Sequence, residues 1–457
     1  MLALFLAYPC FGQNAADQIW TKGVECAARG NLNEAKTEFV KTLEVDPLYE
    51  VAERYLKMIE AVEQQKKDAE AVIIYFKGVD FHLKGQLDKA IDEFSKALLI
   101  KMKFAMAFNG RGIIYSEKGQ HDKAISDFTK AIEIDPKYAN AYLGRGFAYY
   151  NRGQYNQAIA DYNIAIEINP KNAKAYGYRG FAFGQKGQYS LAIQDYDRLV
   201  ELMPKSAWGY YNRGLAYSNL NERDKALSDF NIAIDIDPTN TDAYSRRGFL
   251  YYRNGQYDKA ISDYSKAIEI NPNFAQHYIN RSFAYAESGW YDEAISDCSK
   301  AIEIEPGHYW AFNNRGVAYR FKGEYDKAIS DFSKAIEINP KLAMAYSNRG
   351  IAYTEGKGRY DEAISDFSIA IDIDPTNADT YNYRGYAYDH KNQNDRAISD
   401  YNKAIILNPQ HVDAYINRGI SYGTRGQNDR ACSDMKRACE LGFCEHYDKA
   451  KNDGVCQ

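Results

Sequence analysis

Apolar and small side chains recur along the chain in two alternating helical patterns, and this pair of patterns repeats every 34 residues. With each copy numbered from 1 to 34, positions 4, 8 and 11 are mostly Tyr, Gly and Tyr, and positions 20, 24 and 27 are mostly Ala, Phe or Tyr, and Ala. Spacings of three and four residues place such side chains on one face of an α-helix. Each copy therefore predicts two amphipathic helices. Examples are Tyr346, Gly350 and Tyr353 for the first helix, and Ala328, Phe332 and Ala335 for the second.

The copies follow one another without gaps over most of the chain. They begin at residues 71, 105, 139, 173, 207, 241, 275, 309 and 343. The copy at 343 carries one extra residue in its turn, GKGRY at 356–360, so the last two copies begin at 378 and 412. A further copy occupies 16–49, which makes twelve copies in all.

Turn and stop signals separate the two helices of each copy. Position 15 is Gly in ten copies and Asn in two, Asn221 and Asn392, as expected for a left-handed residue that ends a helix. Position 18 is always Asp, Asn or Ser, such as Asp326, which predicts an N-cap for the second helix. Prolines such as Pro340 prevent the second helix from continuing. Each copy is therefore predicted to be a helix–turn–helix unit.

These features resemble the tetratricopeptide repeat, and the resemblance covers residues 16 to about 445. It implies an all-α fold, an α-solenoid in which stacked pairs form a right-handed superhelix with one continuous core. Three positions depart from the family pattern: Met102 replaces a proline, Ser282 a glycine and Cys298 an aromatic residue. The predicted organisation is a signal-like segment at 1–15, an outlying first repeat at 16–49, an extra helix and linker at 50–70, eleven continuous repeats at 71–445 and a capping helix at 446–457.

Position 7 departs from the family, which usually has Leu there, because ten copies have Arg and the first two have Lys22 and Lys77. Position 23 changes with it: it is Glu38 and Glu93 in those two copies and Asp in the other ten. A long Arg with a short Asp, and Lys with Glu, predicts that the two positions touch, since an unpaired buried charge is costly. The predicted pairs include Arg315 with Asp331 and Arg349 with Asp366, although the aspartate of the preceding copy is an equal candidate. An anion-binding row of arginines is the alternative interpretation.

Four of the seven cysteines lie close together near the C-terminus. A short helix folded back on the last repeat would place Cys444 beside Cys439 and Cys456 beside Cys432. A Cys444–Cys456 bond would have to span that helix, about 15 Å long, which is more than a disulfide can bridge. We therefore predict the pairs Cys439–Cys444 and Cys432–Cys456. The spacing lacks the paired C-x-x-C of structural zinc sites, so no metal is expected.

The apolar run at residues 2–8 resembles the hydrophobic part of a secretory signal, although no basic residue precedes it. Together with the paired cysteines it favours export, to the periplasm or the outside, over a cytoplasmic location; the alternative for this run is an unstructured tail. No other segment is apolar enough to cross a membrane. The net charge of −5 gives no reason to expect nucleic acid.

No catalytic motif is present: there is no G-x-S-x-G, P-loop, H-E-x-x-H or dinucleotide fingerprint. We therefore expect no enzyme activity and no cofactor. The family resemblance implies a protein-interaction scaffold that binds an extended protein segment in a concave groove. The alternative is a binder of glycans or other small extended ligands in the cell envelope.

The resemblance also implies that positions 2, 5, 6, 12 and 13 line the groove, while position 9, which stays apolar, packs between copies. Recurring Asn at position 6 resembles the asparagine ladder with which the repeat arm of O-linked N-acetylglucosamine transferase holds a peptide backbone; alternatively, it is an ordinary surface residue. The candidate groove residues are Trp208, Tyr211, Asn212, Arg246, Tyr252, Arg253, Asn280, Trp310, Asn314 and Arg320. The C-terminal groove is acidic, with Glu355, Asp379, Asp389 and Asp413. We expect a partly acidic segment to dock across 207–323, anchored by Tyr211, Arg253 and Trp310, none of them on the core face.

Overall fold

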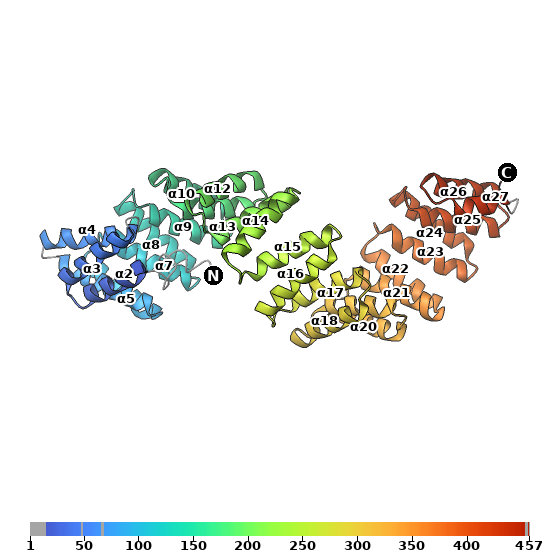
Figure 1. The fold of residues 1–457 in the computed structure, drawn as a ribbon, viewed down its shortest axis with the longest axis horizontal. Helices are drawn as coiled ribbons and strands as arrows, with labels where there is room; N and C mark the ends of the chain where they lie inside the picture. Colours follow the sequence, from blue (N-terminus) through green and yellow to red (C-terminus); the bar gives the residue numbers. More distant parts are fainter. Residues whose placement is uncertain (1–14, 47–48, 65–67, 453–455, 457) are drawn as a thin grey trace. The chain divides into compact units, whose positions relative to one another are not determined.

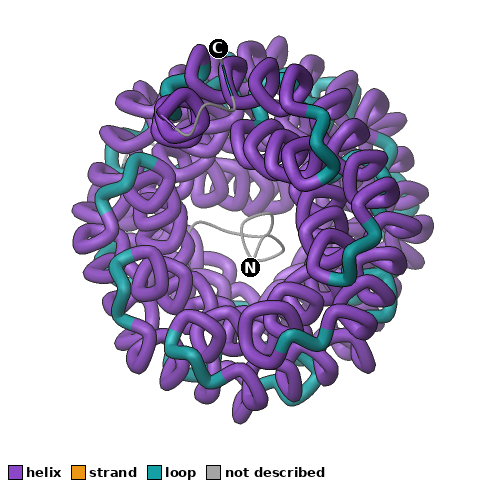
Figure 2. The backbone as a smooth tube through the Cα atoms, turned by 90° about the vertical axis from the view of Figure 1, so that its right-hand side faces the viewer, coloured by secondary structure: helices purple, strands orange, loops and turns teal. Residues whose placement is uncertain are grey.

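The computed structural model describes residues 15–46, 49–64, 68–452 and 456. Within these ranges the regular structure is helical throughout, without a strand, and short turns join the helices (Figure 2). The signal-like segment was predicted at residues 1–15, and all of it except Ala15 lies outside the described part. The chain divides into two compact units, Met1–Pro238 and Thr239–Gln457.

The helices of the two units are labelled in Figure 1. Those of the first unit are α2 (Ala15–Ala28), α3 (Leu32–Val45), α4 (Glu50–Gln64), α5 (Ala69–Leu83), α6 (Leu87–Ile100), α7 (Ala105–Glu117), α8 (His121–Ile134), α9 (Ala139–Asn151), α10 (Tyr155–Ile168), α11 (Ala173–Gln185), α12 (Tyr189–Leu202), α13 (Ala207–Asn219) and α14 (Arg223–Ile236). Those of the second unit are α15 (Thr241–Arg253), α16 (Tyr257–Ile270), α17 (Ala275–Glu287), α18 (Tyr291–Ile304), α19 (Tyr309–Phe321), α20 (Tyr325–Ile338), α21 (Ala343–Lys357), α22 (Tyr360–Ile373), α23 (Ala378–His390), α24 (Asn394–Leu407), α25 (Val412–Thr424), α26 (Asn428–Glu440) and α27 (Glu445–Asn452).

Each predicted copy is one pair of helices, and successive pairs stack on one another within each unit. The second helix of a pair packs against its own first helix and against the first helix of the next copy, and the first helices of neighbouring copies also touch. The all-α fold of stacked helical pairs that the repeats predict is therefore confirmed. Only α4 and α27, among the described helices, lie outside the pairs.

The left-handed residue at position 15 ends the first helix as predicted. Gly323 has φ 77°, and the two asparagines that replace glycine, Asn221 and Asn392, have φ 60° and 56°. Beyond the turn, the N–H of Glu324 donates to the carbonyl of Tyr319 at 2.9 Å. This is the bond that closes a helix C-terminus around a left-handed residue, and it returns the chain at once into the second helix.

The N-cap prediction for position 18 is wrong, because the second helix begins two residues earlier than an N-cap at that position requires. In the copy at 309, α20 starts at Tyr325, the N-cap position belongs to Glu324, and Asp326 is the second helical residue. In six of the twelve copies this side chain instead binds the position-14 side chain of the following copy. Lys322 donates to Asp292 at 2.5 Å and Lys186 to Asn156 at 2.7 Å. The same contact joins Lys118 to Asp88, Arg152 to Asp122, Lys391 to Asp361 and Arg425 to Asp395.

Glycine at position 8 allows the two helices of a copy to approach closely around the position-24 ring. A Cβ added to Gly316 would lie 2.7 Å from a ring carbon of Phe332, which is fully buried. Burying such a ring stabilises the fold by about 1.5–3 kcal/mol. The small residue at position 8 and the large residue at position 24 therefore form one packing unit, repeated in nearly every copy.

The first copy shares a core with the array although residues 50–70 separate them in sequence. The helix expected in that segment is α4, and the buried rings of Trp20, Phe39, Tyr55 and Phe76 form one cluster from α2 to α5. The centroids of Phe39 and Phe76 lie 5.9 Å apart, and those of Phe39 and Tyr55 lie 5.6 Å apart. The insertion is thus accommodated as an additional packed helix.

At the other end, α27 folds back on α26 and brings the four cysteines together in the pairs expected from the sequence. The Cα atoms of Cys432 and Cys456 lie 5.4 Å apart, and those of Cys439 and Cys444 lie 3.9 Å apart, with the sulfur atoms of each pair at bonding distance. Cys26 and Cys298 are buried, and burial raises the pKa of the Cys298 thiol to about 12.

Alkylation of the protein with iodoacetamide tests this arrangement. Without reductant, Cys432, Cys439, Cys444 and Cys456 are expected to stay unmodified even in denaturant, because their sulfurs are bonded. Cys298 should react only after unfolding, since a buried thiol with a raised pKa forms little thiolate. Mass spectrometry of peptides gives the labelling of each site. Labelling of the four C-terminal cysteines in denaturant without reductant would contradict the disulfides.

Candidate functional site

The arginines at position 7 form a seam inside the solenoid. Arg315 donates from Nε and Nη2 to the carboxylate of Asp331 in the same copy, at 2.7 and 2.9 Å, and from Nη1 to Ser299 of the preceding copy at 3.0 Å. These bonds raise the pKa of Arg315. The bidentate contact recurs in Arg111–Asp127, Arg145–Asp161, Arg179–Asp195, Arg213–Asp229, Arg247–Asp263, Arg281–Asp297, Arg349–Asp366, Arg384–Asp400 and Arg418–Asp434.

This geometry decides which aspartate each arginine uses, which the sequence left open. It also leaves little of the guanidinium for an anion, because two of its nitrogens serve the same copy and, in most copies, a third serves the copy before. In the first copy Lys22 donates to Glu38 at 3.0 Å in the same manner. The arginine row is therefore part of the scaffold.

The candidate groove residues of the first unit lie against the core. Trp208 packs on the rings of Tyr178, Phe181 and Tyr196 at centroid distances of 6.3, 6.1 and 6.1 Å. Asn212 is buried and donates to the carbonyl of Trp208 at 2.8 Å. The ring of Tyr211, in turn, lies 6.0 Å from that of Phe230. Trp208 thus packs on α11 and α12, whereas the hydrogen bond of Asn212 stays within α13.

In the second unit, Trp310 is half-buried against a core cluster that contains Phe312 and Leu342, so the expectation that it avoids the core is wrong. The asparagines at position 6 bind neighbouring side chains. Asn280 accepts a hydrogen bond from Gln276 at 2.8 Å. Asn314 accepts a longer one from Asn313. Asn313 itself accepts a hydrogen bond from Asn348 at 3.1 Å. These bonds use the Oδ1 atoms of Asn280 and Asn314, whereas Nδ2 of Asn314 is buried and has no hydrogen-bond partner among the described residues.

The remaining predicted residues face outward to different degrees. Arg246 and Arg253 are exposed on α15, and the ring of Tyr252 lies 6.5 Å from that of Phe283. Arg320 lies over the ring of Phe321 at 4.4 Å and donates to Glu355 of the next copy at 2.9 Å. Arg246 and Arg253 are therefore the exposed cations of this set, whereas Arg320 already has an anionic partner.

Sequence reasoning missed a row of exposed apolar side chains on the first helices of the second unit. At position 9, Phe249 is 44% and Phe283 39% exposed, and Tyr386 and Ile420 are exposed as well, so the prediction that position 9 packs between copies is wrong there. Phe321 at position 13 is 55% exposed, and Met344 at position 2 is also exposed. We call this set the apolar row: Phe249, Phe283, Phe321, Met344, Tyr386 and Ile420.

The difference between the units has a visible cause in position 6 of the following copy. In the first unit the ring of Tyr178 lies 5.7 Å from that of Phe147 at position 9 of the preceding copy, and Phe147 is buried. After Phe249 and Phe283, by contrast, position 6 of the next copy is an asparagine, Asn280 or Asn314. Phe249 and Phe283 therefore lack the ring that covers Phe147; Phe181 is also followed by an asparagine, Asn212, but there the ring of Trp208 lies 6.1 Å away.

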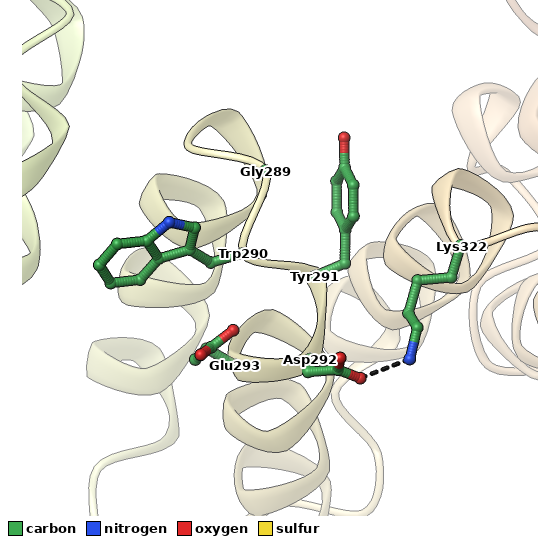
Figure 3. A pocket seen from close by; sticks show the side chains of 6 residues that line it. All are labelled: Gly289, Trp290, Tyr291, Asp292, Glu293 and Lys322. Carbon is green, nitrogen blue, oxygen red and sulfur yellow. Dashed lines mark hydrogen bonds and ion pairs between the residues drawn. The ribbon is translucent and has the colours of Figure 1, made fainter.

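A second candidate binding site lies at the turn between the two helices of the copy at 275, and Figure 3 shows it. An open cavity of about 330 Å³ is lined by Trp290, Tyr291, Asp292, Glu293 and Lys322, with Gly289 at its edge. Trp290 stands where most other copies have Gln or Glu, and it is 50% exposed. Tyr291 stacks on Phe321 at 5.4 Å, and the Asp292–Lys322 ion pair closes one side (Figure 3). The exposed indole beside Glu293 is the part left open to a ligand.

Neither metal binding nor a membrane crossing is indicated by the described residues. No three His, Cys, Asp or Glu side chains among them are placed to hold a metal ion together. No described helix has both the length and the hydropathy that a bilayer crossing requires.

A solenoid of paired helices joined by left-handed turns is the class of fold that these observations define. The chain belongs to the tetratricopeptide repeat family. Models of this repeat match residues 207–240, 241–274, 309–342 and 378–411, further ones match 113–153, 148–187, 182–221 and 357–389, and others match 264–296 and 400–433. A model of the protein prenyltransferase alpha subunit repeat also matches 291–321. Proteins of the tetratricopeptide family are typically non-enzymatic scaffolds for protein interactions.

Three solved structures are similar to parts of this chain. MamA shares 31% identity over 35% of this chain and 94% of its own, with a TM-score of 0.34. YrrB, described as a TPR protein with an unusual peptide-binding site, shares 29% over 40% and 95%, with a TM-score of 0.36. A tetratricopeptide repeat protein from Parabacteroides merdae shares 23% over 55% and 99%, with a TM-score of 0.46. No curated protein sequence matches the chain.

Proposed function

We propose that this protein is a non-enzymatic scaffold that binds an extended protein segment along the first helices of its second unit. The observation that carries the proposal is the apolar row, in which most first helices of this unit contribute an exposed ring or aliphatic side chain. Exposed apolar patches on soluble proteins mark interaction sites, and aromatic side chains are common binding hot spots. Main-chain groups of an extended segment could reach the polar side chains between them.

The charges on the same helices indicate how charge is distributed along the bound segment. Arg246 and Arg253 are exposed on α15, whereas Asp379 and Asp413 are exposed on α23 and α25. A segment that is acidic at one end and basic at the other complements both ends of this surface. The proposal keeps the acidic end of the segment beside Arg253, as expected from the sequence. It moves the aromatic anchors from Tyr211 and Trp310 to the apolar row.

Replacing Phe249, Phe283 and Phe321 together by serine is expected to weaken peptide binding at least tenfold. Two hot spots at about 1–2 kcal/mol each are enough for that change. The probes are peptides selected on the full chain from a displayed library of short random sequences. Fluorescence anisotropy of the labelled peptides gives their dissociation constants for both proteins.

A matched control replaces Ile270, Ile369 and Ile406 by serine, because these exposed apolar side chains lie on second helices. That variant should bind the peptides as the unchanged protein does. Equal weakening in both triple variants, or none in the first, would move the site away from the apolar row. A library from which the protein enriches no peptide would contradict the scaffold function itself.

A glycan-binding function is the second candidate, and the cavity of Figure 3 favours it. An exposed indole beside carboxylates offers a sugar ring both an apolar face and hydrogen-bond acceptors. A glycan array distinguishes the candidates. A saccharide retained by the protein and lost in Trp290→Ala would favour the glycan function over the scaffold.

We also propose that the protein is exported to an oxidising compartment. The proposal rests on the signal-like residues 2–8 and on the two cysteine pairs beside α27. The alkylation experiment described with the fold tests it, because free C-terminal thiols would remove its main support.

A further inference from the structure

A small cavity lies between the last two copies, on the helices that carry the apolar row. It has a volume of about 270 Å³ and is lined by residues of α23, α24 and α25 and of the turn between α23 and α24. Pockets for drug-sized ligands typically measure about 300–1,000 Å³. A cavity of this size suits one side chain of a larger partner.

A carboxylate forms its polar wall. Oδ2 of Asp389 accepts hydrogen bonds from the hydroxyls of Tyr401 at 2.9 Å and Ser421 at 2.5 Å. Oδ1 of Asp389 is enclosed and has no hydrogen-bond partner among the described residues. Burial raises the pKa of this carboxyl, and the two hydroxyl bonds oppose that effect. A donor placed in the cavity would satisfy the oxygen that is now without one.

The rings of Tyr386 and His390 and the side chain of Ile420 form one part of the lining, beside polar side chains such as Asn392 and Asn417. The ring of Tyr386 contacts that of His390 edge-on at 4.4 Å, and His390 stacks on Tyr360 of the preceding copy at 4.8 Å. Ile420 of the following copy also lines the cavity and, like Tyr386, is partly exposed. An aliphatic chain that ends in a cation fits between such sides, because its stem packs on the ring and its charge favours the aromatic face.

The charge around the cavity also selects a cation. Asp379 and Asp413 are exposed on the same helices. The nearest Lys and Arg side chains along the sequence are already paired, since Arg384 donates to Asp400 and Lys391 to Asp361. No Lys or Arg lines the cavity.

We propose that this cavity receives a lysine or arginine side chain of the bound segment, with its cationic group at Oδ1 of Asp389 and its stem beside Tyr386 and Ile420. The inference rests on the proposed scaffold function and names the residue type that one end of the partner must carry. The exposed acidic residues on α23 and α25 bring the basic end of the segment to the site.

Peptides selected on the full chain test the proposal. They are expected to share a Lys or Arg at one fixed position, and its replacement by norleucine should weaken binding to the unchanged protein at least tenfold. On Asp389→Asn the same replacement should change binding less than about twofold, because the two changes act on one contact. Asparagine can still accept from Tyr401 and Ser421, so the fold is retained. Tyr386→Ala, at an exposed side chain, is the second variant and should weaken both peptides.

Asp413→Asn is the matched control, since it removes the same charge from the same helices outside the cavity lining. It should keep the tenfold difference between the basic and norleucine peptides. Peptides that bind without a preferred basic residue, or whose preference survives in Asp389→Asn, would overturn the inference and leave the scaffold function standing. Failure to enrich any peptide would remove both.

Discussion

Replacing Arg315 by leucine is expected to lower the free energy of unfolding of the copy at 309–342 by about 3–5 kcal/mol, the usual cost of breaking a buried ion pair from one side. The Asp331 side chain is only 9% exposed and would lose two charge-assisted bonds. Ser299 of the preceding copy would lose its contact with the guanidinium as well. The change therefore weakens both the copy and its junction with the copy before.

The measurement must be local, because repeat arrays unfold by nearest-neighbour steps and a global midpoint understates a change in one copy. Amide hydrogen exchange across α19 and α20, together with urea unfolding, provides both views. Lys334→Leu is the control, since its partner Glu337 is exposed and such pairs contribute about 0–1 kcal/mol. A similar loss of stability in the two variants would refute the structural role of the seam. Unchanged amide hydrogen exchange in Arg315→Leu would refute it as well.

Replacing both partners separates a missing bond from a stranded charge. Arg315→Leu combined with Asp331→Leu leaves an apolar seam without an unpaired carboxylate. Such replacements are often neutral, so the double variant should recover most of the lost stability. A double variant as unstable as Arg315→Leu alone would mean that the seam depends on the shape of the guanidinium and not on charge pairing.

Features confined to one copy could be predicted from the sequence. The left-handed turn at Asn221 and Asn392 follows from backbone sterics, and the contact of Arg315 with Asp331 follows from the matched sizes of two positions. In each case the residue type and its spacing determine the contact. Neither depends on what the neighbouring copy contributes, apart from the choice between two aspartates.

Features that depend on the next copy were harder to predict. Position 18 was interpreted as a cap within its own copy, yet Asp292 binds Lys322 of the following one. Position 9 was interpreted as packing, yet Phe249 is exposed because Asn280, and not a ring, follows at position 6. Trp208 was interpreted as a groove residue, yet its ring packs in the space that Gly177 leaves by lacking a Cβ. In all three cases a helical pattern predicts a face but not what covers it.

The copy at 275 offers a stringent test of packing, because it departs from the pattern at both positions of the packing unit. It has Ser282 at position 8 and Cys298 at position 24, and both are buried. In the next copy a Cβ on Gly316 would approach Phe332 to 2.7 Å. A side chain larger than glycine at position 8 therefore requires a smaller one at position 24, and the two departures compensate each other.

Cys298→Phe alone is expected to destabilise this copy by about 1–3 kcal/mol, because the new ring would overlap Ser282. Ser282→Gly alone should cost about 1 kcal/mol through the helix propensity of glycine. The combined variant restores the Gly–Phe unit of the neighbouring copies, so its stability should return to that of the unchanged protein. The two substitutions are thus coupled by about 2 kcal/mol or more. Amide hydrogen exchange across α17 and α18 gives the local stability of the unchanged protein, the two single variants and the combined variant. Additive losses of stability would show that the two departures are unrelated.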